Sequence, residues 1–507
     1  MSEQVDLLVI GGGINGAGVA RDAAGRGLSV ILCEKGDLAE GTSSRSGKYI
    51  HGGLRYLEYY EFRLVREALI EREVLLEAAP HITWPMRLIL PHSPEQRPRW
   101  LIRLGLFLYD HLGGRKRLPK TRAVDLRTAP EGAPIRPAFA RAFEYSDVWV
   151  DDSRLVVLNA VDAARRGAEI LTRTACTSAR REDGLWRATL RDVRTGQLRE
   201  VLARGIVNAA GPWVETVLST VAGVNSSRRV RLVKGSHIIM KRWWQGEHGY
   251  VLQAADRRLI FVNPYFDDLA LIGTTDIPFD GAAEDVAIDA GEIDYLLAIL
   301  NRYFLTALTP ADVIASYSGV RPLYDDDSAK HASAVTRDYS FDLDGAPDRA
   351  PILSAFGGKI TTYRKLAEHA LERLKPYYSE MGGPWTGTSP LPGGGIPGAD
   401  FAAFLRSFQA AHPWLPAPLA RHYARAYGTD AASLLDTVRG VEDLGCHFGG
   451  LFYEIEARWL VAREWAQTAE DILQRRTKHG LFLTPEEQTA FADWLARQQP
   501  EPVTAAV

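Results

Sequence analysis

The sequence is poor in cysteine and has no long apolar run, and both absences limit what the protein can be. Its three cysteines, Cys33, Cys176 and Cys446, lie far apart and form neither a CxxC pair nor a metal-ligand spacing. We therefore expect no disulfide framework and a reducing compartment. No stretch reaches the roughly eighteen apolar residues that a transmembrane helix needs. The first residues also lack the basic region of a signal peptide, which favours the cytoplasm.

An excess of one charge sign is missing as well. The chain has 60 Lys and Arg against 63 Asp and Glu, a formal net charge of −3. Proteins that bind nucleic acid usually carry a basic excess, so a nucleic-acid partner is not expected. The length of 507 residues predicts two or three domains, because single hydrophobic cores stop growing well below that size.

A glycine-rich turn follows the first predicted strand, Val5 to Ile10, and precedes a segment with helical spacing, Ile14 to Arg26. In Gly11-x-Gly13-x-x-Gly16 the first glycine permits a tight turn and the second lets the backbone approach a pyrophosphate. The third lets the helix pack closely on the strand. The start of that helix, at Ile14 and Asn15, would then face the phosphates. This strand-turn-helix unit predicts a dinucleotide site, although a plain glycine turn stays the alternative.

The kind of dinucleotide is indicated by residues further along the chain. Glu34, just past the second predicted strand, can accept hydrogen bonds from a ribose diol and would repel a 2′-phosphate, which disfavours NADP. Gly357 and Gly358 would let the backbone lie against a flat ring, and Thr361 is predicted to cap the helix that follows. The positive end of that helix would stabilise an anionic reduced flavin, which favours FAD. A third strand-to-helix turn, at Gly211, is predicted beside the first.

The remaining pattern divides the chain into three parts. Residues 229–275 alternate in short apolar segments typical of an antiparallel sheet. Proline and glycine cluster at Leu391 to Gly398, which we interpret as a linker, and nearly everything beyond it has helical spacing. We predict a discontinuous dinucleotide domain (1–80, 150–225 and 340–390), a substrate-binding and membrane-facing domain (81–149 and 226–339), and a C-terminal α-helical domain (391–507).

An amphipathic segment from Arg97 to Leu112 carries one tryptophan among many apolar residues, and a basic run ends at Arg122. Such a segment is typical of a helix that lies in the membrane interface. A core helix followed by a solvated loop explains the same pattern equally well.

Several blocks, in order along nearly the whole chain, resemble the FAD-dependent glycerol-3-phosphate dehydrogenases, the aerobic respiratory enzymes of bacteria within the D-amino-acid-oxidase-like group. The blocks are Ile10 to Gly18, Ile50 to Glu58, Lys234 to His237, Ile272 to Asp276, Tyr317 to Leu323 and Gly357 to Lys359. The second and fifth are the most specific. The resemblance implies an α/β fold, α+β overall, with a Rossmann-type FAD-binding domain, an antiparallel-sheet substrate domain and a helical cap. It also implies a quinone acceptor and peripheral binding to the inner face of the cell membrane.

The resemblance also assigns residues to the two ligands. It implies FAD contacts from Thr42, Ser43, Ser44, Lys48, His51, Gly52 and Gly53, and a substrate site formed by Arg55, Tyr56, Thr275, Arg321 and Lys359. The planar guanidinium group of arginine can donate two hydrogen bonds to a phosphate. Oxidation of a secondary alcohol also needs a base that takes the hydroxyl proton. His237 and His51 are the candidates, and His237 is preferred. The chain departs from the family pattern at Gly47, where a serine is expected, and at Tyr49, where a leucine is expected.

The leading hypothesis is oxidation of sn-glycerol 3-phosphate to dihydroxyacetone phosphate, with electrons passing through FAD to a quinone. An oxidase that uses oxygen, and an amine or 2-hydroxy-acid oxidising relative, remain alternatives. So does an FAD-stabilised binding or tRNA-associated protein without activity. No metal is expected, and a homodimer is left open.

Overall fold

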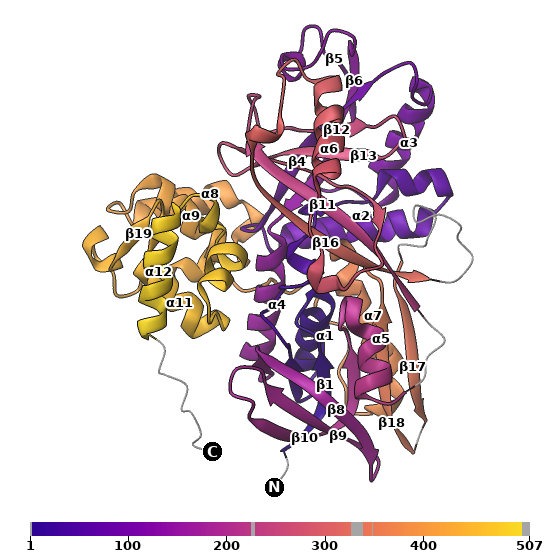
Figure 1. The fold of residues 1–507 in the computed structure, drawn as a ribbon, viewed down its shortest axis with the longest axis vertical. Helices are drawn as coiled ribbons and strands as arrows, with labels where there is room; N and C mark the ends of the chain where they lie inside the picture. The colour runs from indigo at the N-terminus through magenta and orange to yellow at the C-terminus, as the bar shows by residue number, and fades with distance from the viewer. Residues whose placement is uncertain (1–2, 225–228, 326–337, 347, 499–507) are drawn as a thin grey trace.

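Two β-sheets and a helical domain make up the computed structural model, which describes residues 3–224, 229–325, 338–346 and 348–498 (Figure 1). The two sheets lie one above the other in Figure 1, and the helical domain stands to one side of them. Segments from the first, middle and last thirds of the chain contribute to the first sheet, which is why its ligand-binding turns are far apart in the sequence.

The first sheet is parallel at its centre, where β1 (Glu3–Ile10) lies between β2 (Val30–Cys33) and β10 (Leu198–Asn208). The strand order is β17-β18-β10-β1-β2-β7, and the β8-β9 hairpin continues antiparallel from β10. Ile10 pairs with Asn208, and Asn208 pairs with Ser354, so the turns that follow β1, β10 and β18 share one edge. The other strands are β7 (Glu169–Leu171), β8 (Thr174–Glu182), β9 (Leu185–Asp192), β17 (Ser340–Ala346) and β18 (Arg349–Phe356).

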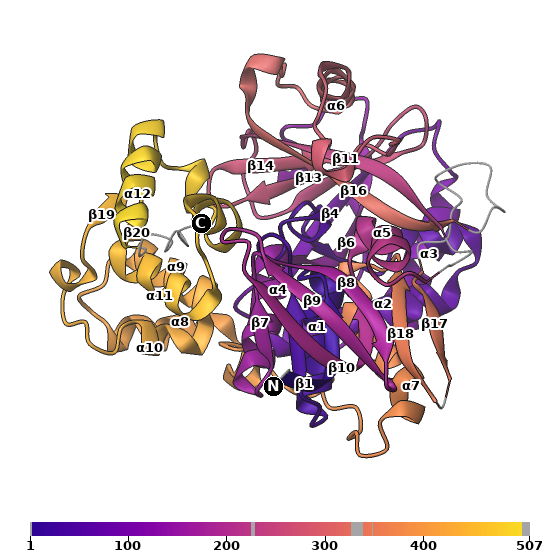
Figure 2. The same cartoon turned by 60° about the horizontal axis from the view of Figure 1, so that its bottom comes forward.

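Both faces of this sheet are buried. Successive side chains of β1 point to opposite faces, so β1 contributes to the core on each side. Leu7 and Val9 pack against the helices of one face, and Leu8 and Ile10 belong to the core on the other. The first face is covered by α1 (Ile14–Gly25), α4 (Asp152–Arg165) and α7 (Tyr363–Leu374). The second is covered by the β8-β9 hairpin and the short α5 (Val214–Thr216), as Figure 2 shows.

The second sheet is largely antiparallel and has the order β15-β11-β14-β13-β12-β4-β6-β3, with β16 on β11 and β5 on β6. Helix α6 (Ala290–Tyr303) covers one face, and α2 (Phe62–Ala78) and α3 (Arg99–Leu112) cover the other. Its strands are β3 (Tyr49–Ile50), β4 (Thr83–His92), β5 (Arg122–Asp125), β6 (Arg141–Val150), β11 (Arg229–Lys241), β12 (Gly249–Gln253), β13 (Leu259–Tyr265), β14 (Leu269–Gly273), β15 (Ile277–Pro278) and β16 (Val313–Asp325). Strand β3 belongs to this sheet although its residues fall within the predicted dinucleotide domain.

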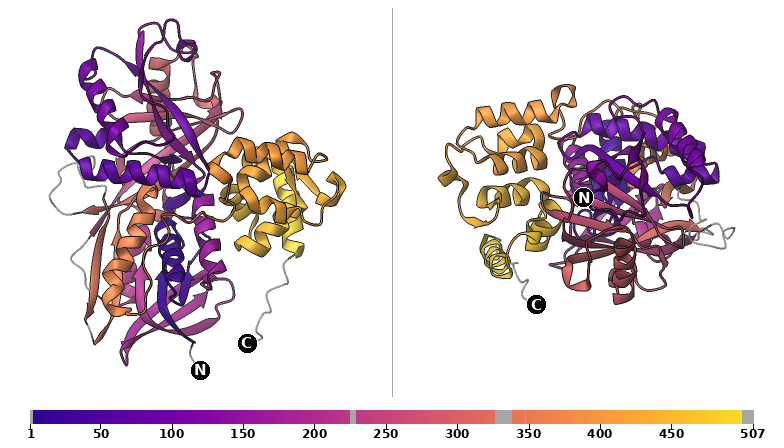
Figure 3. Two further views of the ribbon diagram at one scale, coloured as in Figure 1. Left: turned by 180° about the vertical axis from the view of Figure 1, so that it is seen from behind. Right: turned by 90° about the horizontal axis from the view of Figure 1, so that it is seen from above.

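The C-terminal domain has its own apolar core and stands to one side of the two sheets (Figure 3). Its helices and strands are α8 (Phe401–Ala411), α9 (Ala417–Tyr427), α10 (Ala431–Leu434), α11 (Glu454–Glu464), α12 (Pro485–Gln498), β19 (His447–Gly449) and β20 (Phe452–Tyr453). Buried ion pairs join it to the rest of the molecule. Arg475 Nε and Arg476 Nη2 each lie 2.7 Å from a carboxylate oxygen of Asp37, in the loop after β2, and Arg154 of α4 pairs with Glu464.

Candidate active site

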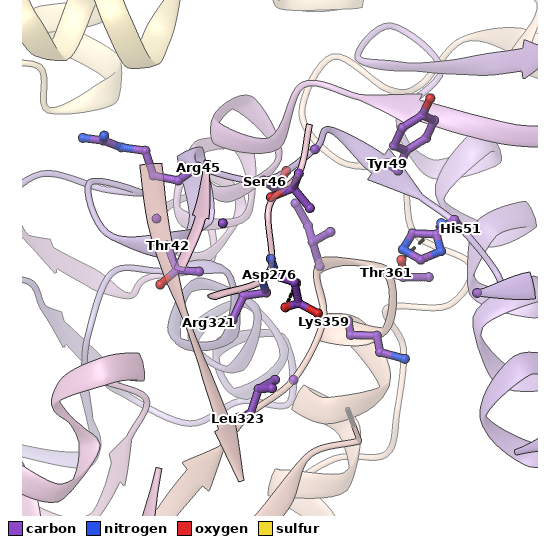
Figure 4. A pocket seen from close by; sticks show the side chains of 18 of the residues that line it. Thr42, Arg45, Ser46, Tyr49, His51, Asp276, Arg321, Leu323, Lys359 and Thr361 are labelled. Carbon is purple, nitrogen blue, oxygen red and sulfur yellow. Dashed lines mark hydrogen bonds and ion pairs between the residues drawn. The ribbon is translucent and has the colours of Figure 1, made fainter. Parts of the chain in front are cut away.

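A cavity of about 1950 Å³ is lined by residues from both sheets. Sites for small molecules usually measure about 300–1000 Å³, so this cavity has room for a dinucleotide and a further substrate. It runs from the turns at the edge of the first sheet to the face of the second sheet that carries His237 and Arg321. Figure 4 shows part of its wall, where Arg321 lies beside Asp276 and His51 lies beside Thr361.

The turn after β1 has the geometry expected for pyrophosphate binding. Gly11 has a φ of +112°, and a Cβ there would stand 2.6 Å from the carbonyl oxygen of Ala209, so only glycine fits. Helix α1 begins at Ile14 after Gly13, which has no side chain to cap it, and Gly13, Ile14 and Asn15 line the cavity. The Ile14 N–H donates to Ser43 Oγ at 2.9 Å. A helix start of this kind presents backbone N–H groups and a positive dipole end to phosphate oxygens.

Glu34 lies at the end of β2 and faces the same cavity. Its carboxylate accepts the backbone N–H groups of Gly12, at 2.6 Å, and of Gly36, at 2.8 Å. Burial raises the pKa of this carboxyl, and the two backbone donors oppose the shift. The side chain is therefore fixed in the cavity wall, and its contact with a ribose diol stays a prediction.

The second glycine turn lies against the first, although 342 residues separate the two in sequence. Asn15 Nδ2 donates to the Gly357 carbonyl at 3.2 Å, and both Gly357 and Gly358 adopt positive φ and line the cavity. The predicted threonine cap is wrong. A short 3-10 segment, Ile360–Thr362, intervenes before α7, and the N-cap residue Thr362 makes no side-chain cap bond. Thr361 Oγ1 instead accepts the backbone N–H of His51 at 3.3 Å.

Three of the cationic side chains that line the cavity are predicted substrate residues. Arg321 of β16 donates from Nη2 to the Thr275 carbonyl at 2.8 Å and pairs with Asp276 at 3.3 Å. Lys359 Nζ stands 3.8 Å from the ring centroid of Tyr56, and Arg55 precedes Tyr56 in the 3-10 segment Leu54–Tyr59. Two guanidinium forks and one ammonium group in one cavity suit a phosphate dianion.

Both candidate bases also line the cavity. The His237 ring stacks on Tyr317, with centroids 4.8 Å apart, and among the described residues neither of its nitrogens has a hydrogen-bond partner. Burial, together with the charges of Lys48 and Arg321, lowers its pKa to about 3, so the imidazole is neutral near pH 7. The ring lies against Gly273, where a Cβ would stand 2.2 Å from His237 Cδ2. His51 comes from the loop after β3.

Five predicted residues do not line the cavity within the described ranges. Lys48 is buried and pairs with Asp152 at 2.8 Å; burial would lower its pKa, but the carboxylate outweighs that effect and raises it. Thr275 Oγ1 donates to Glu292 Oε1 at 2.7 Å, so only the Thr275 carbonyl serves the site, through Arg321. The five residues are Gly16, Ser44, Lys48, Gly52 and Thr275.

Three residues that shape the site were not predicted from the sequence. Asp276 and Tyr317 hold Arg321 and His237, and each stands in a motif block that could have drawn attention to it. Glu292 of α6 is buried and accepts from Ser236 and Thr275, but nothing in its own segment marks it. A cluster of His422, Glu456 and His479 has metal-ligand geometry, yet it lies in the C-terminal domain, away from the cavity.

Comparison with known proteins agrees with this geometry. Residues 6–364 match the model of the FAD-dependent oxidoreductase family, and residues 385–497 match the C-terminal domain of α-glycerophosphate oxidase. D-erythritol 1-phosphate dehydrogenase of Brucella abortus is 62% identical over 97% of this chain and 98% of its own length. Aerobic glycerol-3-phosphate dehydrogenase of Escherichia coli is 52% identical over 97% of each chain.

Among solved structures, the glycerol-3-phosphate dehydrogenase from Bacillus halodurans complexed with FAD superposes with a TM-score of 0.75 at 27% identity. The match covers 98% of this chain and 94% of that one. The positive-φ glycines, the start of α1 and the fixed Glu34 carboxylate form a cradle that fits the same cofactor. The cofactor is FAD, and the chain belongs to the FAD-dependent oxidoreductases, in the family of the bacterial glycerol-3-phosphate dehydrogenases.

Proposed function

We propose that this protein oxidises the secondary hydroxyl of sn-glycerol 3-phosphate to the ketone of dihydroxyacetone phosphate. The observation that carries the proposal is one cavity that joins a fitted FAD cradle to Arg55, Arg321 and Lys359. The family's relatives named for glycerol 3-phosphate support the same substrate. When bound, FAD supplies the acceptor for the hydride that leaves the carbinol carbon.

The side chains of this wall perform the remaining tasks. Arg55, Arg321 and Lys359 hold the phosphate, and the neutral imidazole of His237 takes the hydroxyl proton while two electrons leave as hydride. Thr275 and Asp276 keep the Arg321 guanidinium in place through the two contacts described above. The products are the ketone, one proton on the base and FAD reduced by two electrons.

We further propose that a membrane quinone takes these two electrons and is released as quinol. The cavity extends to α3, where Leu101, Leu104 and Leu108 line it. Trp100, Leu104 and Phe107 are exposed along one side of that helix, while Leu106 and Tyr109 are buried beneath it. An apolar opening of this kind suits a lipid-soluble acceptor. Among the described helices none has the length and apolar character to cross a bilayer.

The exposed side of α3 is proposed to bind the inner face of the cell membrane. Tyr59, Tyr60 and Phe62 add apolar side chains in the neighbouring segment. Of the basic run, Arg115 pairs with Asp110 and Arg117 donates to the Gly398 carbonyl, whereas Lys116 and Lys120 are exposed. Aromatic side chains beside exposed lysines are typical of an interfacial helix.

Vesicle sedimentation tests the membrane proposal. The protein should sediment with phosphatidylglycerol vesicles at low salt, and the double variant Lys116→Glu, Lys120→Glu should sediment much less. Lys375→Glu, an exposed charge reversal on another part of the surface, is the matched control. Equal sedimentation of the double variant and wild type would contradict the assignment.

Anaerobic bleaching of the flavin tests the reaction itself. We expect glycerol 3-phosphate to bleach it, and D-amino acids and 2-hydroxy acids to leave it oxidised. Bleaching by an amino acid or hydroxy acid alone would assign the cations to a carboxylate instead. Stoichiometric peroxide release in air, without added acceptor, would favour an oxidase over a quinone-linked dehydrogenase.

A second candidate substrate is D-erythritol 1-phosphate. The relative named for that substrate is 62% identical to this chain, whereas the E. coli relative named for glycerol 3-phosphate is 52% identical. Both substrates are polyol phosphates with a secondary hydroxyl, so the same cations and base serve either. The two substrates differ in the length of the carbon chain.

A further inference from the structure

Gly47 leaves a gap in the cavity wall beside the preferred base. A Cβ at this position would stand 3.5 Å from His237 Nε2 and 3.8 Å from Tyr49 Cδ2, which are ordinary van der Waals distances. The φ of Gly47 does not lie in the left-handed region, so the backbone does not require glycine here. The missing side chain therefore provides space, and the space faces the cavity that Gly47 lines.

Two polar side chains line the same cavity, and the ring of one of them, Tyr49, borders this gap. Tyr49 Oη donates a hydrogen bond to Asn263 Oδ1, and both side chains are buried and line the cavity. Asn263 lies on β13, two residues beyond Phe261. Phe261 pairs with Gly273 of β14, and Gly273 pairs with His237 of β11. The Asn263 amide nitrogen is a donor and the Tyr49 oxygen keeps lone pairs, so a hydroxyl beside this pair can be hydrogen-bonded when it leaves water.

We infer that Gly47, Tyr49, His237 and Asn263 form a subsite, here called the Gly47 subsite, for the additional CHOH group of a four-carbon polyol phosphate. This inference rests on the proposed oxidation of a polyol phosphate. D-erythritol 1-phosphate exceeds glycerol 3-phosphate by one CHOH group, and that group needs both space and hydrogen-bond partners. Gly47 supplies the space, and the Tyr49–Asn263 pair supplies the partners. Gly47 is thus a specificity-determining residue, because any side chain there narrows the subsite.

The experiment compares two substrates in the FAD-loaded enzyme. The second-order rate constant of anaerobic flavin reduction is measured with D-erythritol 1-phosphate and with sn-glycerol 3-phosphate for wild type, Gly47→Ala and Gly47→Ser. Gly383→Ser is the matched control, because Gly383 is exposed and a Cβ there meets nothing within 4 Å. FAD content, from the ratio of flavin to protein absorbance, is measured for each variant, and Gly47→Ala serves if Gly47→Ser binds FAD poorly.

We expect wild type to be reduced by both substrates, and Gly47→Ser to lower the ratio of the tetritol constant to the glycerol constant about tenfold or more. Gly47→Ala should lower it less, and Gly383→Ser should leave it unchanged. Reduction of wild type by glycerol 3-phosphate alone would overturn the subsite and leave the proposed function intact. An unchanged ratio in Gly47→Ser and Gly47→Ala would do the same. Failure of both substrates to bleach wild-type flavin would instead refute the proposed function.

Discussion

Replacement of His237 by alanine is the sharpest test of the proposed chemistry. A drop in the pKa of this imidazole from 6.5 to about 3 corresponds to about 5 kcal/mol of lost proton affinity. Burial is the largest cause, and the charge of Arg321 contributes. A phosphate dianion bound at Arg321 offsets that charge, so the substrate itself restores part of the affinity. A positioned base usually contributes about 10²–10⁴ in rate, and we expect a loss in that range.

The assay is single-turnover flavin reduction at saturating glycerol 3-phosphate, followed by stopped-flow absorbance. Wild type should show no acid limb between pH 6 and 9, since the imidazole stays unprotonated there. Gly273→Ala should slow reduction too, because its methyl group would overlap the His237 ring, while His447→Ala, an exposed residue, should not. A His237→Ala rate within about threefold of wild type, at full FAD content, would remove His237 from the mechanism. If His51→Ala alone then abolished reduction, His51 would be the base.

Three further predictions follow from named contacts. Arg321→Lys loses the fork that reaches both Thr275 and Asp276, so the KM for glycerol 3-phosphate should rise about tenfold; an unchanged KM in steady-state assays would place the phosphate elsewhere. Glu34→Gln sets an amide NH₂ group against a buried backbone donor at Gly12 or Gly36, so FAD should be lost on gel filtration, and full retention would refute the ribose assignment. His81 is buried with a pKa lowered to about 3, so the unfolded chain binds its proton first and the folded state loses about 2 kcal/mol as the pH falls from 7 to 5. His81→Leu should therefore lose less thermal stability than wild type over that pH range, and parallel Tm-against-pH curves would contradict this.

Elements whose ends are marked by glycine in the local sequence could be predicted. Strand β1 and helix α1 are predicted within two residues at each end, because glycines separate a β-branched run from a segment with helical spacing. Strands β4 and β6 gave no such signal. Pro85 and Pro91 interrupt β4, and β6 buries Asp147, which is stabilised by Arg72 at 2.8 Å. A buried carboxylate is recognisable as part of a core only once its partner is known.

The site residues differ in the same way: some could be predicted from a local motif, and others depend on contacts between distant segments. Gly11, Gly13 and Glu34 lie in or beside their own local turns, and motif spacing alone singled out these residues, which line the cavity. The direction in which Thr275 points, and the contacts that hold Arg321, depend on the pairing of β11 with β14 and β16, which are separated by tens of residues in the chain. The Thr361 cap was wrong because a 3-10 turn comes before α7. Register between distant strands cannot be read from a local pattern.

The ion pairs at Asp37 tie the C-terminal domain to the loop that follows Glu34. Asp37 lies three residues after Glu34, is fully buried, and receives both Arg475 and Arg476. A truncated chain ending at the linker would leave that carboxylate without these cations, a loss that usually costs about 3–5 kcal/mol. We expect the loop that follows Glu34 to rearrange as a result. A helical domain grafted from a relative should therefore carry both arginines, so that these ion pairs are kept.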